Sequence, residues 1–231
     1  MRNIYILWAS IRPDFVQKTS QVWINNCTNK ENLFFKIAMA SEEQKILVES
    51  YQIPNCEVSC ITERGGYNYA ITQLTLNLEV NDDDILVLLS DDFSCLPAWD
   101  KYLLKKFDSW EWALFLDDGC QDVHRKSGKL CITLACMTYK CLKRLNKVVF
   151  TPNYYHFFSD DEAFYNLYDL GLLKDDRDKD HFIFHHQHHS SGYRARDQHD
   201  FTAVEHWDED NAMWNKRSQM NVQERLRTIL G

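Results

Sequence analysis

The sequence contains little glycine and proline, with 7 and 4 of its 231 residues. Together with 45% hydrophobic and 26% charged residues, this composition excludes collagen-like, disordered and low-complexity chains. No apolar run approaches the roughly 18–20 residues that span a bilayer. The N-terminus also lacks the long apolar stretch and small-residue cleavage site of a signal peptide. We therefore expect a soluble, cytoplasmic protein.

An excess of positive charge is absent as well. The chain has 34 acidic and 26 basic residues and a net charge of −8. This balance argues against a protein that coats nucleic acid, although it leaves room for a local basic site.

The eight cysteines include no C-x-x-C pair, so a zinc ribbon or a dithiol redox motif is not expected. Several of them, such as Cys131 and Cys136, stand inside apolar runs. This placement is typical of free, buried thiols in a reducing compartment.

What the sequence does contain is an alternation of apolar strands and amphipathic helices. The first part predicts strands at 4–9, 34–40, 58–62 and 85–89, with helices at 14–27, 42–51 and 68–80 between them. The second part predicts strands at 112–116, 130–136, 148–150 and 182–185, and helices from 97, at 160–170 and at 208–230. The strand Ile85–Leu89 is apolar throughout, as in a parallel sheet that helices cover on both faces. We therefore expect an α/β layered protein with neither internal repeats nor a flexible linker.

Ser90, Asp91 and Asp92 directly follow the strand at 85–89. Ligands of open α/β sheets bind beyond the carboxyl ends of the strands. Two carboxylates at such a place can hold a hard divalent cation, which in turn neutralises substrate phosphates. The alternative is a turn that leads into the next helix. A longer acidic run at 82–84 precedes the strand, so we expect it to form a solvated turn at the opposite end of the sheet.

A second acidic segment, Ser159 to Glu162, enters a predicted helix. One interpretation is a helix cap, because S-x-x-E forms a capping box and early carboxylates complement the helix dipole. The other is a general base supplied by Asp160 or Asp161. The two interpretations are compatible, since a rigid helix start can also aim a catalytic carboxylate.

Histidines are concentrated in one segment, at positions 181, 185, 186, 188 and 189. Such a cluster suits transition metals including manganese and zinc. There is no H-E-x-x-H motif, and a solvated polar loop is the alternative. One histidine can also complete a metal site with Asp92.

The segment from Arg64 to Asn68 contains Gly65 and Gly66 but is neither a Walker loop nor a G-x-G-x-x-G fingerprint. It predicts a turn before a helix, with Asn68 as a possible helix cap and Arg64 close to an anionic ligand.

In this order, the motifs resemble those of the GT-A fold of nucleotide-sugar glycosyltransferases, especially small family-2-like members, including those carried by phages. The resemblance covers residues 3–215. The loop from Ala9 to Pro13 resembles the family's nucleotide-contacting loop. The run ILVLLSDDF is similar to its D-x-D segment, with Ser90 in place of the first aspartate and Asp92 at the main metal position.

Further along the chain, FFSDDEAFYNLYDLG resembles the family's catalytic-base segment, with Asp160 aligned to the base and Asp161 as the alternative. His186-Gln187-His188, with Gly192 and Asp197 downstream, matches an H-x-H segment that supplies a third metal ligand.

The resemblance implies a single Rossmann-like, three-layer GT-A domain over 1–231 with a mostly parallel central sheet. Residues 1–95 would bind the nucleotide sugar, 96–205 the acceptor, and 206–231 would form a C-terminal helix. It further implies transfer from a nucleotide-diphosphate sugar, a UDP-sugar first, to a hydroxyl, with inversion. The implied donor-binding residues are Ser10, Arg12, Arg64, Asn68, Ser90 and Asp91, and the implied ligands of Mn²⁺ or Mg²⁺ are Asp92, His186 and His188.

Seven lysines and arginines, and no acidic residue, lie between Val123 and Val149: Arg125, Lys126, Lys129, Lys140, Lys143, Arg144 and Lys147. They form either an ordinary solvated face or a patch for an anionic acceptor. In a phage-like transferase that acceptor would be DNA with a hydroxylated or hydroxymethylated base, flipped onto Tyr154, Tyr155 or Phe157.

Two alternative functions remain at the sequence level. Because Ser90 weakens metal chelation, the chain can be a pseudo-transferase that only binds nucleotide or sugar. A sugar-phosphate nucleotidyltransferase is the other alternative, but no glycine-rich loop with a basic residue follows the first strand.

Overall fold

The computed structural model describes residues 2–61, 66–119, 130–177, 182–187, 195–196 and 198–229. Its strands are β1 (Ile4–Ser10), β2 (Leu33–Met39), β3 (Cys56–Cys60), β4 (Ile85–Leu89), β5 (Phe93–Cys95), β6 (Ala113–Phe115), β7 (Ala135–Thr138), β8 (Leu173–Asp175) and β9 (Phe184–His186). Its helices are α1 (Pro13–Asn25), α2 (Glu42–Ser50), α3 (Gly66–Leu76), α4 (Trp99–Ser109), α6 (Tyr139–Arg144), α7 (Ser159–Asp169), α8 (Gln198–Glu205), α9 (Trp207–Arg217) and α10 (Val222–Arg227), and a 3-10 turn spans Lys30–Asn32.

Seven strands form the central sheet in the order β3-β2-β1-β4-β7-β6-β8. Strands β3, β2, β1 and β4 are mutually parallel, β7 is antiparallel to both β4 and β6, and β6 is parallel to β8. The sheet is therefore mostly parallel, as the sequence predicts, and the carboxyl ends of β1 and β4 lie at one edge. A second, two-stranded sheet pairs β5 with β9 in antiparallel fashion.

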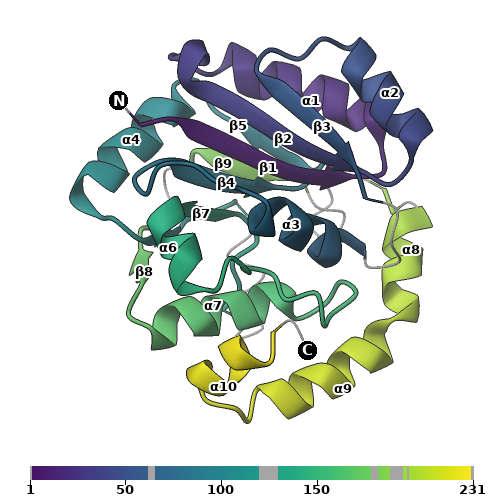
Figure 1. The fold of residues 1–231 in the computed structure, drawn as a ribbon, viewed down its shortest axis with the longest axis vertical. Coiled ribbons are helices and arrows are strands. Elements are labelled where there is room, and N and C mark those ends of the chain that lie inside the picture. Colours follow the sequence, from purple (N-terminus) through teal and green to yellow (C-terminus); the bar gives the residue numbers. More distant parts are fainter. Residues whose placement is uncertain are drawn as a thin grey trace.

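Helices cover both faces of the central sheet (Figure 1). Alternate residues of β1 point to opposite sides, because side chains alternate along a strand. Leu7 belongs to a core that includes residues of α3, α6, α7 and α10, whereas Trp8 belongs to a core that includes residues of α1, α2 and α4. All five residues of β4 are buried, in keeping with its position inside the sheet. The predicted three-layer α/β architecture is confirmed.

Three predicted elements differ in the structure. The strand expected at 130–136 begins only at Ala135, and residues 148–150 form no strand. The helix expected at 208–230 is divided into α9 and α10, because Asn221 starts α10 with a capping box to Glu224. Within the described chain, no helix combines the length and the apolar character needed to cross a bilayer.

The cysteines follow the prediction where they are described. Seven of the eight are free thiols, five of them buried, and Cys120 lies outside the described residues.

Candidate functional site

Asp91, just after β4, forms hydrogen bonds with residues at the carboxyl end of β1 and in the loop that follows it. Its Oδ1 accepts a hydrogen bond from the indole Nε1 of Trp8 at 2.9 Å, and its Oδ2 accepts one from Nε of Arg12 at 2.7 Å. The residue is 7% exposed. Burial raises the pKa of Asp91, and Arg12, Ser10 and Trp8 counter this rise. Asp91 was predicted to be a donor-binding residue; in the structure its two oxygens accept hydrogen bonds from Trp8 and Arg12.

The loop after β1 is built around the same aspartate. Ser10 accepts a hydrogen bond on Oγ from the backbone N–H of Arg12 at 2.9 Å, which turns the chain before Pro13 begins α1. The Arg12 guanidinium lies over the ring of Phe15, 4.8 Å from its centroid. Ser10 and Arg12 therefore stand at the carboxyl edge of the sheet, where the sequence places them.

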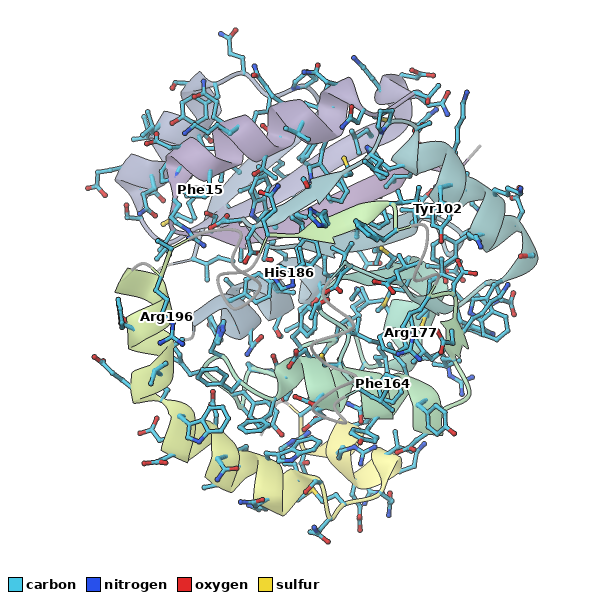
Figure 2. All side chains as sticks on the ribbon, turned by 180° about the vertical axis from the view of Figure 1, so that it is seen from behind. Phe15, Tyr102, Phe164, Arg177, His186 and Arg196 are labelled. Atoms are coloured by element: carbon cyan, nitrogen blue, oxygen red, sulfur yellow. The ribbon has the colours of Figure 1, made fainter. Side chains whose placement is uncertain are left out.

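Asp92 faces His186. Their closest atoms, Asp92 Oδ2 and His186 Nε2, are 3.3 Å apart, and the Ser90 hydroxyl donates to the other carboxylate oxygen at 2.7 Å. The small sheet creates this contact, because β5 follows Asp92 and pairs Phe93 with His186. The Phe93 ring also stacks on the imidazole, with centroids 4.3 Å apart. Figure 2 shows His186 near the middle of the molecule.

A carboxylate that the sequence analysis did not select lies on the other side of this imidazole. Asp118 Oδ2 is 3.4 Å from His186 Nδ1, and Asp118 is itself 1% exposed and bonded to the Thr133 hydroxyl. Burial opposes protonation of His186, but Asp118 and Asp92 outweigh it and raise the pKa of His186 to about 9. The imidazole is thus held between two carboxylates.

A usable signal for Asp118 was present in the sequence. The apolar strand β6 is followed by Asp117, Asp118 and Gly119, the same strand-then-carboxylate pattern that follows β4. Gly119 has a φ of +77°, and a Cβ there would come within 2.6 Å of the His185 ring. Glycine is therefore needed for this turn to pass beside β9.

The start of α7 brings two more carboxylates to the same region. Asp160 is half-buried and Asp161 is buried. Burial first, and then Asp160, Asp161 and Asp118, raise the pKa of the Cys131 thiol. Three carboxylates thus act on one buried thiol. The Ile132 N–H donates to the Asp160 carbonyl at 3.1 Å, and the Thr133 hydroxyl donates to Asp118, which lies 3.4 Å from His186. The segment after Cys131 therefore connects the start of α7 to the Asp92–His186 pair.

The predicted capping box at Ser159–Glu162 is wrong. Phe158 occupies the N-cap position with a φ of +66°, and Ser159 is the first helical residue. Glu162 instead pairs with Arg217 through two hydrogen bonds of 2.7 and 2.8 Å and accepts a third from Tyr154. Glu162 therefore forms an ion pair with the distant, buried Arg217 and takes no part in capping the helix.

Two further predictions are wrong. Asn68 does not cap α3, which begins at Gly66; its buried side chain donates to the Tyr154 carbonyl at 3.1 Å. Asp84 is not solvated: it is 2% exposed and accepts hydrogen bonds from the backbone N–H groups of Asn3 and Asn81.

Arg64 and His188, together with Gly192 and Asp197, lie outside the described residues.

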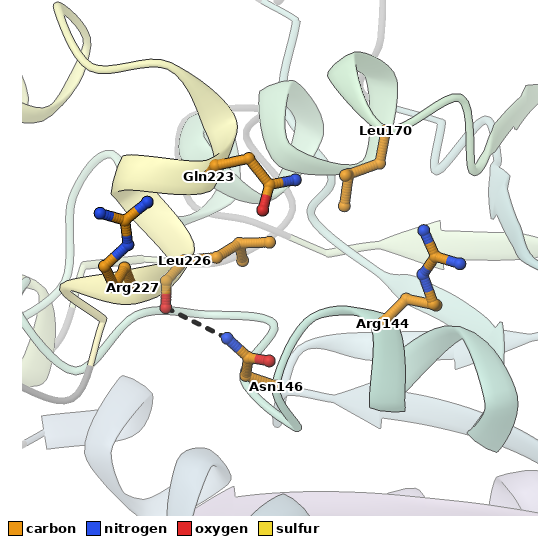
Figure 3. A pocket seen from close by; sticks show the side chains of 6 residues that line it. All are labelled: Arg144, Asn146, Leu170, Gln223, Leu226 and Arg227. Carbon is orange, nitrogen blue, oxygen red and sulfur yellow. Dashed lines mark hydrogen bonds between the residues drawn. The ribbon is translucent and has the colours of Figure 1, made fainter.

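The described residues of the basic stretch lie away from the Asp92–His186 pair. Residues 125, 126 and 129 are outside the described chain, whereas Lys140, Lys143 and Lys147 pair with Glu111, Asp82 and Glu79. The contacts to Asp82 and Glu79 lie at the amino end of β4, opposite the edge that carries Asp92. Arg144 lines a cavity of about 290 Å³ between α6, the end of α7 and α10 (Figure 3).

Among the described residues, no group of three or more His, Cys, Asp or Glu side chains is arranged to hold a metal. Asp92 and His186 are two side chains that could hold one. Ligands about 2.1 Å from one octahedral cation stand roughly 3.0 Å apart on an edge, close to the 3.3 Å between Asp92 Oδ2 and His186 Nε2. The pair fits a site that substrate phosphates and water complete, as is common for such cations.

No protein-family model matches the sequence, and neither does any curated protein. Solved structures do match. The mannosyltransferase PcManGT from Pyrobaculum calidifontis, in complex with GDP-Man and Mn2+, aligns with a TM-score of 0.60 and 14% identity over 78% of this chain and 56% of its own. S. aureus TarS 1-349 in complex with UDP aligns with a TM-score of 0.62 and 12% identity over 79% of this chain and 60% of its own.

The chain has the GT-A fold of these glycosyltransferases. At such low identity the likeness establishes the fold, and the chain spans little more than half of each neighbour.

Proposed function

We propose that this protein is a metal-assisted glycosyltransferase that moves a sugar from a nucleotide-diphosphate donor to a hydroxyl group of an acceptor. The observation that carries the proposal is the convergence of Asp92 and His186, 3.3 Å apart, at the carboxyl edge of a GT-A sheet. The position of the candidate bases is a second support, because the segment 131–133 contacts both Asp160 at the start of α7 and Asp118 beside His186.

In this proposal Asp92 and His186 hold the cation, and His188 is a further candidate ligand. An imidazole nitrogen suits Mn²⁺ better than Mg²⁺. When bound, the cation offsets negative charge on the donor's diphosphate. Ser90 orients Asp92 through its hydroxyl, and Asp91 contributes by fixing Arg12 at the edge where the nucleotide would lie.

The transfer step requires a base. Asp160, with Asp161 as the alternative, would accept the proton of the acceptor hydroxyl. The oxygen then bonds to the anomeric carbon while the bond from that carbon to the diphosphate oxygen breaks, and its electron pair leaves with the diphosphate. A single displacement of this kind inverts the anomeric centre.

For the donor we propose a UDP-sugar first and a GDP-sugar second. The neighbouring structures contain UDP in one case and GDP-Man in the other. Ser10, Arg12, Arg64 and Asn68 are the proposed donor-side residues, with Asn68 acting from inside α3 by holding the Tyr154 carbonyl.

A hydroxylated or hydroxymethylated DNA base is a second candidate acceptor, motivated by the basic stretch at 125–147. The ion pairs of Lys140, Lys143 and Lys147 reduce the charge this stretch offers. A DNA acceptor would therefore depend on the exposed Arg144 and on residues 125–129, and its use would fall steeply with added salt.

Turnover tests the proposal. The protein is incubated with Mn²⁺ and UDP-glucose, UDP-galactose, UDP-N-acetylglucosamine or GDP-mannose, and release of the nucleoside diphosphate is measured with and without acceptors. Release that an acceptor accelerates supports a transferase. Binding of a donor without any release would instead support the pseudo-transferase, which the serine at position 90 favours.

A further inference from the structure

The loop that precedes α7 carries consecutive aromatic side chains toward the start of α9. Phe157 and Trp207 meet edge to face, with ring centroids 4.8 Å apart, and His156 lies edge-on to Phe157 at 5.0 Å. The Trp207 side chain is 40% exposed, although Phe158 packs against it at 5.1 Å. We call His156, Phe157 and Trp207 the aromatic platform.

A single buried carboxylate holds this platform in shape. Asp210, 2% exposed, accepts hydrogen bonds from the backbone N–H groups of Tyr155 at 2.7 Å, His156 at 2.9 Å and Phe157 at 2.8 Å. Asp210 and Trp207 belong to the same helix, α9. Both sides of the platform are therefore fixed by one element, and such preorganisation lowers the entropy cost of binding a ligand.

The loop that carries His156 and Phe157 connects the proposed donor side to the helix that holds the proposed base. On the donor side, Asn68 donates to the Tyr154 carbonyl, and a Cβ at Gly66 would come within 2.8 Å of the Tyr155 carbonyl oxygen. On the other side, the loop runs directly into α7, where Asp160 is the second residue. An acceptor that rests on the platform would thus lie beside the residue proposed to deprotonate it.

We propose that the acceptor is a neutral saccharide that stacks on the aromatic platform, an inference that rests on the proposed transferase function. A sugar ring has a face of C–H bonds and a rim of hydroxyls. Exposed aromatic rings bind such a face, while nearby polar groups fix its orientation.

The charges around the platform favour a neutral acceptor over a nucleic acid. The first turn of α7 contains Asp160, Asp161 and Glu162, and the first turn of α9 contains Asp208, Glu209 and Asp210. Glu162 is neutralised by Arg217, and His206 pairs with Glu209, but the exposed Asp208 adds negative charge beside Trp207. Arg196, labelled beside α8 in Figure 2, is an exposed cation. Asp160, Asp161 and Asp208 outnumber this cation, so the net charge of these described groups disfavours a polyanion.

The stacking role is tested with Trp207→Ala and Trp207→Phe in steady-state assays that vary the acceptor at a saturating donor. The acceptors are maltose, cellobiose, lactose and N-acetylchitobiose, alongside single-stranded and duplex DNA containing hydroxymethylcytosine, each across a salt series. We expect transfer to a saccharide that salt scarcely affects. Trp207→Ala should raise the saccharide KM about tenfold or more, while Trp207→Phe retains most of the affinity. The affinity for UDP or GDP, measured by calorimetry, should not change in either variant.

Tyr168→Ala is the matched control, because Tyr168 is an aromatic residue with 65% exposure at the far end of α7. It should leave the saccharide KM unchanged. Donor turnover combined with an unchanged KM in Trp207→Ala, or transfer to DNA alone with a steep salt dependence, would overturn this inference and leave the transferase function intact. Absence of donor turnover in every arm would overturn both.

Discussion

Arg12 donates a hydrogen bond through Nε to Oδ2 of Asp91 at 2.7 Å, which joins the loop after β1 to the end of β4. This contact separates the roles of two adjacent aspartates. Asp91 is committed to the fold through Arg12 and Trp8, whereas Asp92 turns toward His186. The acidic pair that the sequence presents as one motif therefore divides into a structural carboxylate and a candidate ligand.

Asp91→Asn should lower the free energy of unfolding by about 2–3 kcal/mol, because it removes the partner of a largely desolvated guanidinium. The side chains of Asp91 and Arg12 are 5% and 20% exposed. Asp82→Asn makes the same chemical change in a surface ion pair whose partners are 57% and 45% exposed, and should cost less than about 1 kcal/mol. Urea unfolding measures both. Equal midpoint shifts would contradict the structural role of Asp91.

The Glu162–Arg217 pair should be among the strongest single contributions to stability. Its side chains are 1% and 3% exposed, and it links α7 to α9. Arg217→Ala leaves a buried carboxylate without its counter-charge and should cost about 3–5 kcal/mol. Glu162→Gln combined with Arg217→Met removes both charges and should cost less than Arg217→Ala alone. A double variant that loses as much as the sum of Glu162→Gln and Arg217→Met, each measured alone, would show that the two residues do not interact.

Asp160→Asn should reduce turnover by roughly 10²–10⁴-fold while nucleotide affinity and thermal stability remain near wild type. The physical reason is that an amide keeps the size and polarity of the carboxyl group but cannot accept the acceptor's proton. Asp161→Asn is the parallel variant. If it alone is inactive, the base is Asp161; if both variants turn over normally, the start of α7 contains no base.

Asp118 should control metal affinity through His186. Its Oδ2 lies 3.4 Å from Nδ1 of the imidazole, while Nε2 faces Asp92. Removing such an outer partner costs about 10–100-fold in metal affinity. We therefore expect Asp118→Asn to weaken Mn²⁺ binding by that factor in titrations that follow free Mn²⁺ by electron paramagnetic resonance. Asp117→Asn is the neighbouring control and should bind Mn²⁺ within about twofold of wild type; equal losses in both variants would rule out a specific role for Asp118.

Local patterns in the sequence were sufficient for much of the fold. The apolar run Ile85–Leu89 predicted a buried central strand, and the helix expected from residue 97 is α4, in which Trp99, Leu103 and Phe107 are buried at helical spacing. Such patterns report burial directly, because each depends on residues only a few positions apart. The strand pattern also placed Asp92 at the carboxyl end of β4.

The remaining features depend on contacts between distant segments. The pairing of β5 with β9 brings His186 to Asp92, and no local pattern encodes that pairing. Likewise, the S-x-x-E motif at 159–162 is a valid signature of a helix cap, but Glu162 forms an ion pair with the buried Arg217. Asp84 stands in an acidic run typical of a solvated turn, yet its two carboxylate oxygens accept hydrogen bonds from backbone N–H groups at the amino end of β4.

The central claim is that Asp92 belongs to a metal-dependent donor site, and calorimetric titration of UDP and GDP with and without Mn²⁺ tests it most directly. Asp83→Asn, at an exposed position before β4, is the control variant. We predict that wild type and Asp83→Asn bind one nucleotide at least about tenfold more tightly with Mn²⁺, and that Asp92→Asn loses this gain, because it removes an anionic ligand from a hard cation. Nucleotide binding that Mn²⁺ strengthens equally in Asp92→Asn and wild type would contradict the account.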